Sequence, residues 1–332
     1  MPNREGSATV AKAKTSTFSV ADAFVSPGDR LRLEIPVARL PTGTMLSISL
    51  EAINGARPGP TVWLSAAVHG DEVNGVEIIQ QVLQEIDARS LAGRIIAVPI
   101  VNVFGFAGQS RYLPDRRDLN RSFPGSQRGS MAARLAHLFM TQVVEKCKYG
   151  IDLHTGSNHR TNLPQIRANL SDPETLKLAK AFAAPVLVNA KGIEGSLRLS
   201  ATSLGIRTLV YEAGEPLRFD QDAIRLGRDG VLRVLAALEM RRRAPKREKR
   251  PSVITDKTTW IRARRSGILR IETGLGKEVE AKQQLGSISD TFGDNAVPLL
   301  APCDGVVIGH TNNPLVQQGD AVIHLAETPE SA

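Results

Sequence analysis

The stretch TVWLSAAVHGDEVNG, residues 61–75, decides the fold of this chain. The apolar run Thr61–Val68 predicts a buried strand, and apolar residues at helical spacing from Glu72 to Ile86 predict a helix. His69 and Glu72 lie three positions apart in the turn between them, so both side chains can point to one place. Imidazole nitrogen and carboxylate oxygen are zinc ligands, so the turn predicts half of a zinc site.

The rest of residues 61–242 alternates apolar strands with amphipathic helices, which predicts an α/β domain with a mainly parallel sheet. Short alternating stretches in residues 18–60 predict strands at one edge of that sheet. Further strands are expected at Arg94–Val101, Tyr149–Leu153, Gln165–Leu170, Pro185–Asn189 and Arg207–Tyr211. Helices are expected at Met131–Cys147, Asp172–Ala184, Ser196–Leu204 and Asp220–Arg242.

The C-terminal part has a different character. Residues 258–326 hold short apolar pieces separated by Gly, Asp, Asn and Pro, which predicts a small all-β module. We therefore expect two domains, a catalytic domain at 1–245 and a β-rich domain at 252–328. The segment between them, RRRAPKREKR at 241–250, has seven basic residues and one Glu, a net charge of +6 out of the chain's +8. Only 4% of the residues are aromatic, so the chain has few side chains on which nucleic-acid bases could stack. The run is thus predicted to be a solvated linker, not a nucleic-acid site.

Cysteine usage and hydropathy predict a cytoplasmic protein. The only two cysteines, Cys147 and Cys303, are far apart and form no CxxC pattern, as is usual in a reducing compartment. No apolar run reaches the roughly 18 residues of a membrane helix, so no membrane partner is expected. Residues 1–17 lack the apolar core of a secretory signal and are predicted to be an irregular terminus.

Two more polar residues follow buried strands. His154 ends the strand expected at Tyr149–Leu153, and Glu212 ends the strand expected at Arg207–Tyr211. Ligands of parallel α/β sheets bind at the carboxyl ends of strands, where His69 and Glu72 also lie. A lone His in a turn is more often only hydrogen-bonded, but beside His69 and Glu72 metal ligation is the better interpretation of His154. Two His and one Glu leave a fourth zinc position for water, and Glu212 can act as a general base.

An arginine-rich loop, residues 111–121, completes the candidate site. Arg forks bind carboxylates through two hydrogen bonds and stabilise oxyanions, whereas Arg116 or Arg117 is expected to be solvated. Asp118 can orient a metal-bound His by accepting a hydrogen bond from the ring nitrogen that does not bind the metal.

The motifs HGDE (69–72), RDLNRSFPG (117–125) and DLHTG (152–156), followed by Glu212 after a late strand, resemble the succinylglutamate desuccinylase/aspartoacylase family of zinc hydrolases. The resemblance covers about residues 62–213. It implies a zinc-carboxypeptidase-like α/β fold and one Zn²⁺ per chain. It also implies the roles of single residues: His69, Glu72 and His154 as zinc ligands, and Glu212 as general acid/base.

By the same resemblance, Arg111 polarises the scissile carbonyl, and Asn120 and Arg121 hold the substrate's α-carboxylate. The C-terminal module is similar to the β domain of these proteins, which resembles a biotinyl or lipoyl barrel-sandwich. Residues 294–300 contain no Lys that could be modified, so a carrier role is not expected.

One position departs from the family's pattern. Aspartoacylases carry an arginine in the short helix before the catalytic Glu, where it binds an acidic side chain. Aligned on Glu212, that position falls near Thr202, and the only arginine in the helix is Arg198, which we take as a substrate-binding candidate. Glu194, near that helix, could meet an amine instead. The sequence thus predicts a preference for compounds such as N-acetyl-diaminobutyrate over N-acetylaspartate.

The sequence therefore predicts a cytoplasmic, zinc-dependent amidohydrolase that cleaves the amide of a small N-acyl amino acid. Two alternatives stay open: a metallocarboxypeptidase acting on peptides, and a non-enzymatic binding protein that uses the basic linker and the β module. The expected partner is a small molecule, and the sequence leaves a homo-oligomer open.

Overall fold

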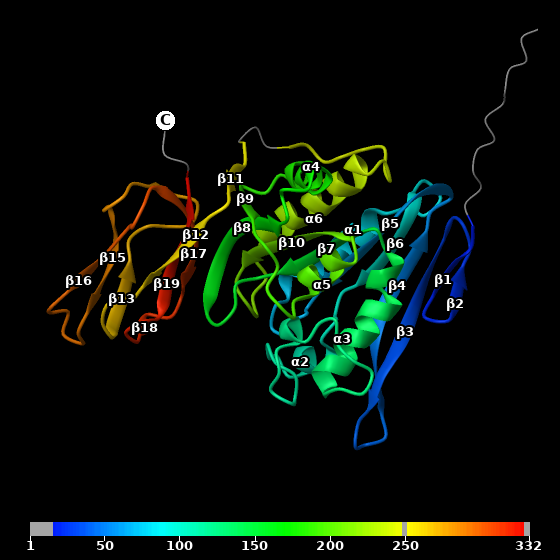
Figure 1. The fold of residues 1–332 in the computed structure, drawn as a ribbon, viewed down its shortest axis with the longest axis horizontal. Helices are drawn as coiled ribbons and strands as arrows, with labels where there is room; N and C mark the ends of the chain where they lie inside the picture. The colour runs from blue at the N-terminus through cyan, green and yellow to red at the C-terminus, as the bar shows by residue number, and fades with distance from the viewer. Residues whose placement is uncertain (1–15, 248–250, 329–332) are drawn as a thin grey trace, which may run out of the picture.

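The computed structural model describes residues 16–247 and 251–328. The predicted irregular N-terminus, apart from Ser16 and Thr17, and residues 248–250 of the predicted linker lie outside the described residues. The described chain forms six α-helices and three sheets, of 13, four and two strands (Figure 1). The helices are α1 (Asn74–Glu85), α2 (Val103–Ala107), α3 (Met131–Gln142), α4 (Pro173–Phe182), α5 (Leu197–Ser203) and α6 (Gln221–Ala237).

A mixed sheet organises the catalytic part of the chain. At its centre β6, β5, β7 and β10 are parallel neighbours, and β4 and β3 extend one edge as antiparallel strands. The bounds are β3 (Asp29–Arg39), β4 (Met45–Asn54), β5 (Arg57–Ala66), β6 (Ala92–Val98), β7 (Tyr149–His154) and β10 (Arg207–Gly214). The short pair β1 (Phe18–Val20) and β2 (Ala23–Val25) forms a separate ribbon. The expected α/β fold with edge strands in residues 18–60 is confirmed.

Helices cover both faces of this sheet, and the side chains of β5 point alternately into the two cores that result. Val62 and Leu64 pack with α1, α4 and α6, whereas Trp63 packs with α3 and α5. Successive strand residues point to opposite faces, so a strand buried on both sides is apolar throughout. This explains the unbroken apolar run that opens the sequence.

Two helices end earlier than their apolar pattern suggests. The helix expected to reach Cys147 ends at Gln142 and is followed by a short 3-10 turn, Val144–Lys146. The helix expected to reach Arg242 ends at Ala237, and Glu239 takes a left-handed conformation with φ of 59° just beyond it. A left-handed residue after the last turn is a common helix stop, although Glu is an unusual choice for it. The apolar residues beyond the end of each helix pack outside any α-helix.

Every element in residues 251–328 is a strand, as expected, and some of these strands continue the central sheet. Strand β10 pairs with β8 (Arg160–Ala168), β8 pairs with β17 (Gly305–Thr311), and β17 pairs with β19 (Ala321–Glu327). The other strands of this extension are β9 (Val186–Asn189), β11 (Val253–Thr255), β12 (Thr258–Arg262) and β14 (Glu278–Val279). A second antiparallel sheet contains β13 (Gly267–Ile271), β15 (Gln284–Ser289), β16 (Val297–Leu300) and β18 (Leu315–Val316), at one end of the molecule in Figure 1.

The C-terminal strands have a core of their own, which includes Leu285, Val307 and Leu325. A smaller cluster joins Val186 and Val188 of β9 to Ile308 of β17. The limits of the two domains, 1–245 and 252–328, stay a prediction, because β11 and β17 both pair with strands of the catalytic part. Within the described residues, no helix has the length and apolar character needed to cross a membrane.

Candidate metal centre and substrate cavity

His69, Glu72 and His154 come together at the carboxyl ends of β5 and β7. Their ligand atoms all lie within 4.8 Å of one another, and the three side chains are buried. Glu72 lies between the imidazoles: Oε1 is 2.7 Å from Nδ1 of His69, and Oε2 is 2.8 Å from Nδ1 of His154. The structure thus brings together the three residues predicted as metal ligands.

Two glycines make this close approach possible. A Cβ on Gly70 would lie 1.9 Å from the backbone of Gly105, so the turn after β5 can pack against α2 only without a side chain. A Cβ on Gly75 would meet the Cβ atoms of Ala66 and Leu153 at 2.7 Å. The first turn of α1 therefore sits directly on β5 and β7, and this packing holds Glu72 over the strand ends.

Each imidazole has a carboxylate behind it. Nε2 of His69 is 3.2 Å from Asp118, and Nε2 of His154 is 2.7 Å from Asp152. Asp152 in turn accepts a hydrogen bond of 2.5 Å from the Ser65 hydroxyl. A carboxylate partner on Nε2 orients each ring so that Nδ1 faces Glu72; Nδ1 donates to this carboxylate when it carries a proton and is free to bind a metal when it does not. Asp118 lies where the orienting role predicted for it requires, and the role itself stays a prediction. Asp152 was missed, although residues two apart in a strand share a face.

Charges in this cluster depend strongly on one another. Burial lowers the pKa of His154, but the carboxylates of Asp152 and Glu72 outweigh it and hold this pKa well above its usual value. The pKa of His69 is likewise raised by Glu72 and Asp118 against the effect of burial. Burial raises the pKa of Glu72, and the two neighbouring imidazoles more than reverse this, so it lies well below its usual range. The cluster therefore attracts positive charge, either as protons or as a metal ion.

The donor set fits zinc. Two imidazole nitrogens and one carboxylate are the protein ligands of many catalytic zinc sites, which keep one position for water. Carboxylates that orient the ligating imidazoles are the usual second layer of such a site. A metal held by His69, Glu72 and His154 would replace the protons that these side chains now share.

Glu212 lies beside this cluster because β10 and β7 are parallel neighbours with Glu212 opposite His154. An irregularity in the pairing with β8, between Glu212 and Gly214, bends the strand there, as bulges beside active sites often do. The amide of Asn162 donates a 2.8 Å hydrogen bond to Oε2 of Glu212, and Nε of Arg167 lies 3.8 Å from Oε1. The carboxylate thus has one firm partner and stays accessible.

The loop of residues 111–121 contributes three predicted residues. Arg111 donates to Asp118 at 2.8 Å and to Glu72 at 3.3 Å, so it lies directly behind the metal cluster. The side-chain oxygen of Asn120 accepts a bond from the backbone N–H of Leu197 at the start of α5, and Arg121 donates to the Asn120 carbonyl. All three line the same cavity, but only Arg111 contacts the predicted metal ligands.

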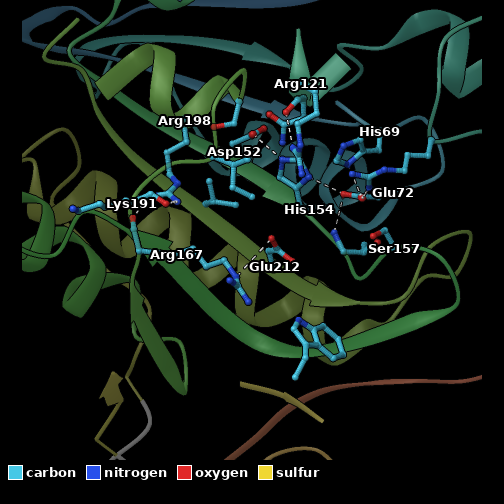
Figure 2. Close-up of a pocket in the computed structure, with 18 residues that line it drawn as sticks. His69, Glu72, Arg121, Asp152, His154, Ser157, Arg167, Lys191, Arg198 and Glu212 are labelled. Carbon is cyan, nitrogen blue, oxygen red and sulfur yellow. Dashed lines mark hydrogen bonds and ion pairs between the residues drawn. The ribbon is translucent and has the colours of Figure 1, made fainter. Parts of the chain in front are cut away.

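The cavity, of about 350 Å³, extends from the metal cluster toward α5 and the C-terminal strands. Figure 2 shows Arg198 and Lys191 on the opposite side of the view from His69. Trp260 of β12 also lines the cavity, so the C-terminal strands form part of its wall. Trp260 is fixed by stacking on His324, with ring centroids 4.2 Å apart and 9° between the planes.

Two predictions about specificity have different outcomes. Arg198 lines the cavity as expected, although its guanidinium donates to the backbone oxygens of Ala190 and Lys191. Glu194 is exposed and is not among the residues that line the cavity, so the structure gives it no contact with a substrate there. Arg167 and Trp260 were not predicted. Arg167 lies on β8, which pairs antiparallel with β10, and Trp260 lies on β12, which pairs antiparallel with β19.

Comparison with known proteins agrees with this geometry. Residues 58–238, more than half of the chain, match the model of the succinylglutamate desuccinylase/aspartoacylase catalytic domain. The chain belongs to this family. The predicted family and its fold are therefore confirmed, whereas the roles assigned to single residues stay predictions.

Among its relatives is an N-alpha-acetyl-L-2,4-diaminobutyric acid deacetylase from Halomonas elongata, 26% identical over 82% of this chain and 84% of the relative. A crystal structure of a family member from Rhodobacter sphaeroides has 27% identity and a TM-score of 0.81, covering 90% of this chain and 96% of that one. The product-bound ectoine utilization protein EutE (DoeB) of Ruegeria pomeroyi, 24% identical, has a TM-score of 0.82 over 96% and 99% of the two chains. This last likeness shows the fold alone.

Proposed function

We propose that this protein is a zinc-dependent deacylase that hydrolyses the amide bond of a small N-acyl amino acid. The observation that carries the proposal is the buried His69, Glu72 and His154 cluster, with Glu212 opposite His154 at the neighbouring strand end. The family is one of zinc hydrolases, and the relative from Halomonas elongata bears the name of a deacetylase of an N-acetyl amino acid. Both support amide hydrolysis of this kind.

His69, Glu72 and His154 would hold the zinc ion, which when bound supplies a Lewis acid and lowers the pKa of water to about 7. Glu212 accepts the proton of the attacking water and later delivers it to the leaving nitrogen. The water oxygen forms a bond to the carbonyl carbon, the C–N bond breaks, and the products are a carboxylate and an amine. Asn162 keeps the Glu212 carboxylate in place through these proton transfers.

The arginines supply charge stabilisation and orientation. Arg111 uses two of its five N–H donors on Glu72 and Asp118, so the remaining donors can meet the oxygen that becomes negative during attack. Arg121 and the amide of Asn120 hold the α-carboxylate at the cavity wall. With one anchor at the carboxylate and one at the carbonyl, the scissile bond is held over Glu212.

The test compares the wild type and Glu212→Gln, both loaded with zinc, on a panel of N-acyl amino acids. General acid–base catalysis contributes typically about 10² to 10⁴-fold, so kcat should fall by that factor while bound zinc stays near one per chain. Gln keeps the shape of Glu and its hydrogen bond to Asn162, so the fold should persist. A wild type that binds no zinc, or a Glu212→Gln variant with full activity, would overturn the proposal.

A further inference from the structure

A buried asparagine joins the turn of the metal cluster to the strand end that carries Glu212. Asn74 is the first residue of α1, and its side chain is buried. Its Nδ2 donates to the backbone oxygen of Ala213 at 3.2 Å, and its Oδ1 accepts from the backbone N–H of Asp220 at 3.1 Å. Because a carbonyl only accepts and an N–H only donates, one orientation of the amide satisfies both partners. The side chain therefore bridges to residues 139 and 146 positions later in the chain.

Local helix formation does not explain an asparagine at this position. The N-terminus of α1 has no side-chain cap hydrogen bond, so Asn74 is not used to cap its own helix. Inside a helix, asparagine is also a weaker helix former than alanine or glutamate. The residue type is explained by its two bonds to the segment that follows Glu212.

The carbonyl that Asn74 holds lies on the back of the strand end. Successive strand residues point to opposite faces, so Glu212 lines the cavity whereas Ala213 packs in the core beneath α1. Ala213 falls where the register between β10 and β8 shifts, between the paired residues Glu212 and Gly214. At such an irregularity the ladder of strand hydrogen bonds is disrupted. The Asn74 amide thus holds the backbone one residue after the predicted base, where the sheet itself holds it less firmly.

Two further contacts fasten the same segment to the metal turn. Gly214 has a φ of 73°, and a Cβ there would lie 2.6 Å from Nδ2 of Asn74, so a side chain at this position would displace the amide. The N–H of Leu217 donates to the backbone oxygen of Asp71 at 2.8 Å. The segment 213–220 is therefore bonded to residues 71–74 through its backbone at Ala213, Leu217 and Asp220.

We propose that Asn74 is a positioning residue that sets the place of the Glu212 carboxylate relative to the metal cluster. The inference rests on the proposed deacylase function, in which Glu212 is the base. Without the Nδ2 donor, the buried Ala213 carbonyl would be left unpaired, and the strand end would shift toward another donor. A misplacement of about 1 Å can cost about 10²-fold in rate, so a small shift of Glu212 is sufficient.

Two variants remove the donor in different ways. Asn74→Asp keeps the shape and the acceptor of the side chain but turns an oxygen toward the Ala213 carbonyl. Asn74→Ser is neutral and too short to reach Ala213, so it separates loss of the donor from a new negative charge near the metal ligands. The matched control is Asn54→Asp, at a buried asparagine of β4 whose Nδ2 donates to the backbone oxygen of Val25 at 2.8 Å. Asn54 is not among the residues that line the cavity.

The zinc-loaded proteins are compared by kcat, KM and zinc content on the best N-acyl amino acid of the panel. Both Asn74 variants should lose about tenfold to a hundredfold in kcat, with little change in KM and one zinc per chain. Asn54→Asp should keep the wild-type kcat. Each Asn74 change is then combined with Glu212→Gln. If Asn74 acts through Glu212, the combined variants should be no slower than Glu212→Gln alone, whereas a general structural loss would lower the residual rate by the full factor again.

Hydrogen exchange of the metal-free protein tests the contact without turnover. Peptides that cover residues 212–220 should exchange faster in both Asn74 variants than in the wild type, and at the wild-type rate in Asn54→Asp. If the carboxylate of Asn74→Asp prevents folding, Asn74→Ser decides the outcome, and failure of both to fold would make Asn74 a folding residue and overturn the proposal.

Other results would also overturn it. A wild-type kcat in Asn74→Asp would mean that only the bond to Asp220 matters, because that variant keeps it. Loss of zinc from both Asn74 variants, equal losses of kcat with and without the Glu212 carboxylate, or unchanged hydrogen exchange would each contradict the positioning role. Failure of the deacylase function appears separately, as no hydrolysis of any N-acyl amino acid by the zinc-loaded wild type.

Discussion

The two ends of the cavity are built in opposite ways. At the metal end, formed by His69, Glu72 and His154, each ligating side chain has a partner, and Asp118 and Asp152 orient the imidazoles. At the arginine end, formed by Arg167 and Arg198, Nε of Arg167 lies 3.8 Å from the Glu212 carboxylate, and Arg198 donates to backbone oxygens. The metal end comes from the ends of central parallel strands, whereas the arginine end comes from β8 and α5, beside Trp260 of the C-terminal strands. We propose that the metal end carries out the chemistry and that the arginine end contacts the substrate.

The largest expected effect breaks the metal end itself. Glu72→Gln removes the carboxylate that both imidazoles share, and a neutral amide is a much poorer zinc ligand. We expect zinc content, measured by atomic absorption after dialysis, to fall from one per chain to near zero, with loss of hydrolysis. Glu77→Gln, the same change five residues later on α1, is the matched control and should keep both. Full zinc occupancy in Glu72→Gln would show that the metal end lies elsewhere.

A smaller effect is expected behind the ligands. Asp152→Asn keeps the shape of the side chain but weakens the hydrogen bond to Nε2 of His154. Outer partners of this kind are typically worth about 10- to 100-fold in metal affinity. Competition with a zinc-binding dye should therefore give a weakened but measurable Kd, between those of the wild type and Glu72→Gln. If Asp152→Asn bound zinc as tightly as the wild type, the orienting role would have to be given up.

The metal end could be predicted from the sequence, and the reason is topological. His69 and Glu72 lie in one turn, and His154 and Glu212 each end a buried strand, so the parallel arrangement alone brings them to the same edge. Arg167 and Trp260 could not be found this way. They reach the cavity through the antiparallel pairs β8–β10 and β12–β19, whose partners no local pattern specifies. Glu194 was expected to meet a substrate amine because it lies near α5 in the sequence, yet its side chain is exposed.

The stability of the metal end should also depend on pH when the metal is removed. The pKa values of His69 and His154 are raised in the folded chain, so protonation stabilises it below the unfolded value of roughly 6.5. This stabilisation is lost as pH rises through the raised values, while Glu72, with its lowered pKa, stays ionised throughout.

The Tm of the chelator-treated protein should thus fall on going from neutral to alkaline pH, by a few degrees for each kcal/mol lost. Zinc should flatten the profile, since the metal takes the place of the protons. His154→Gln should reduce the slope in the metal-free protein, and His310→Gln, on the C-terminal strand β17, should leave it as it is. A metal-free Tm that is independent of pH would contradict the coupling within the cluster.

The smallest effect concerns the wall that the C-terminal strands add to the arginine end. Trp260 of β12 lines the cavity and stacks on His324. Its removal should therefore weaken substrate contacts without changing the metal ligands. Loss of about 1 kcal/mol of contact corresponds to roughly a fivefold change in affinity, so Trp260→Ala should raise KM by about that factor. Phe292→Ala removes an aromatic side chain that is 92% exposed on the same C-terminal part and should change nothing.

Zinc content and kcat separate the two ends in this variant. If Trp260 acts only as a wall, Trp260→Ala keeps one zinc per chain and a kcat close to that of the wild type, and the change is confined to KM. A fall in zinc content would mean that the C-terminal strands also support the metal end, and the division between chemistry and substrate choice would fail. Because β17 pairs with β8, which carries both Asn162 and Arg167, this variant measures how far the two ends are coupled through one strand.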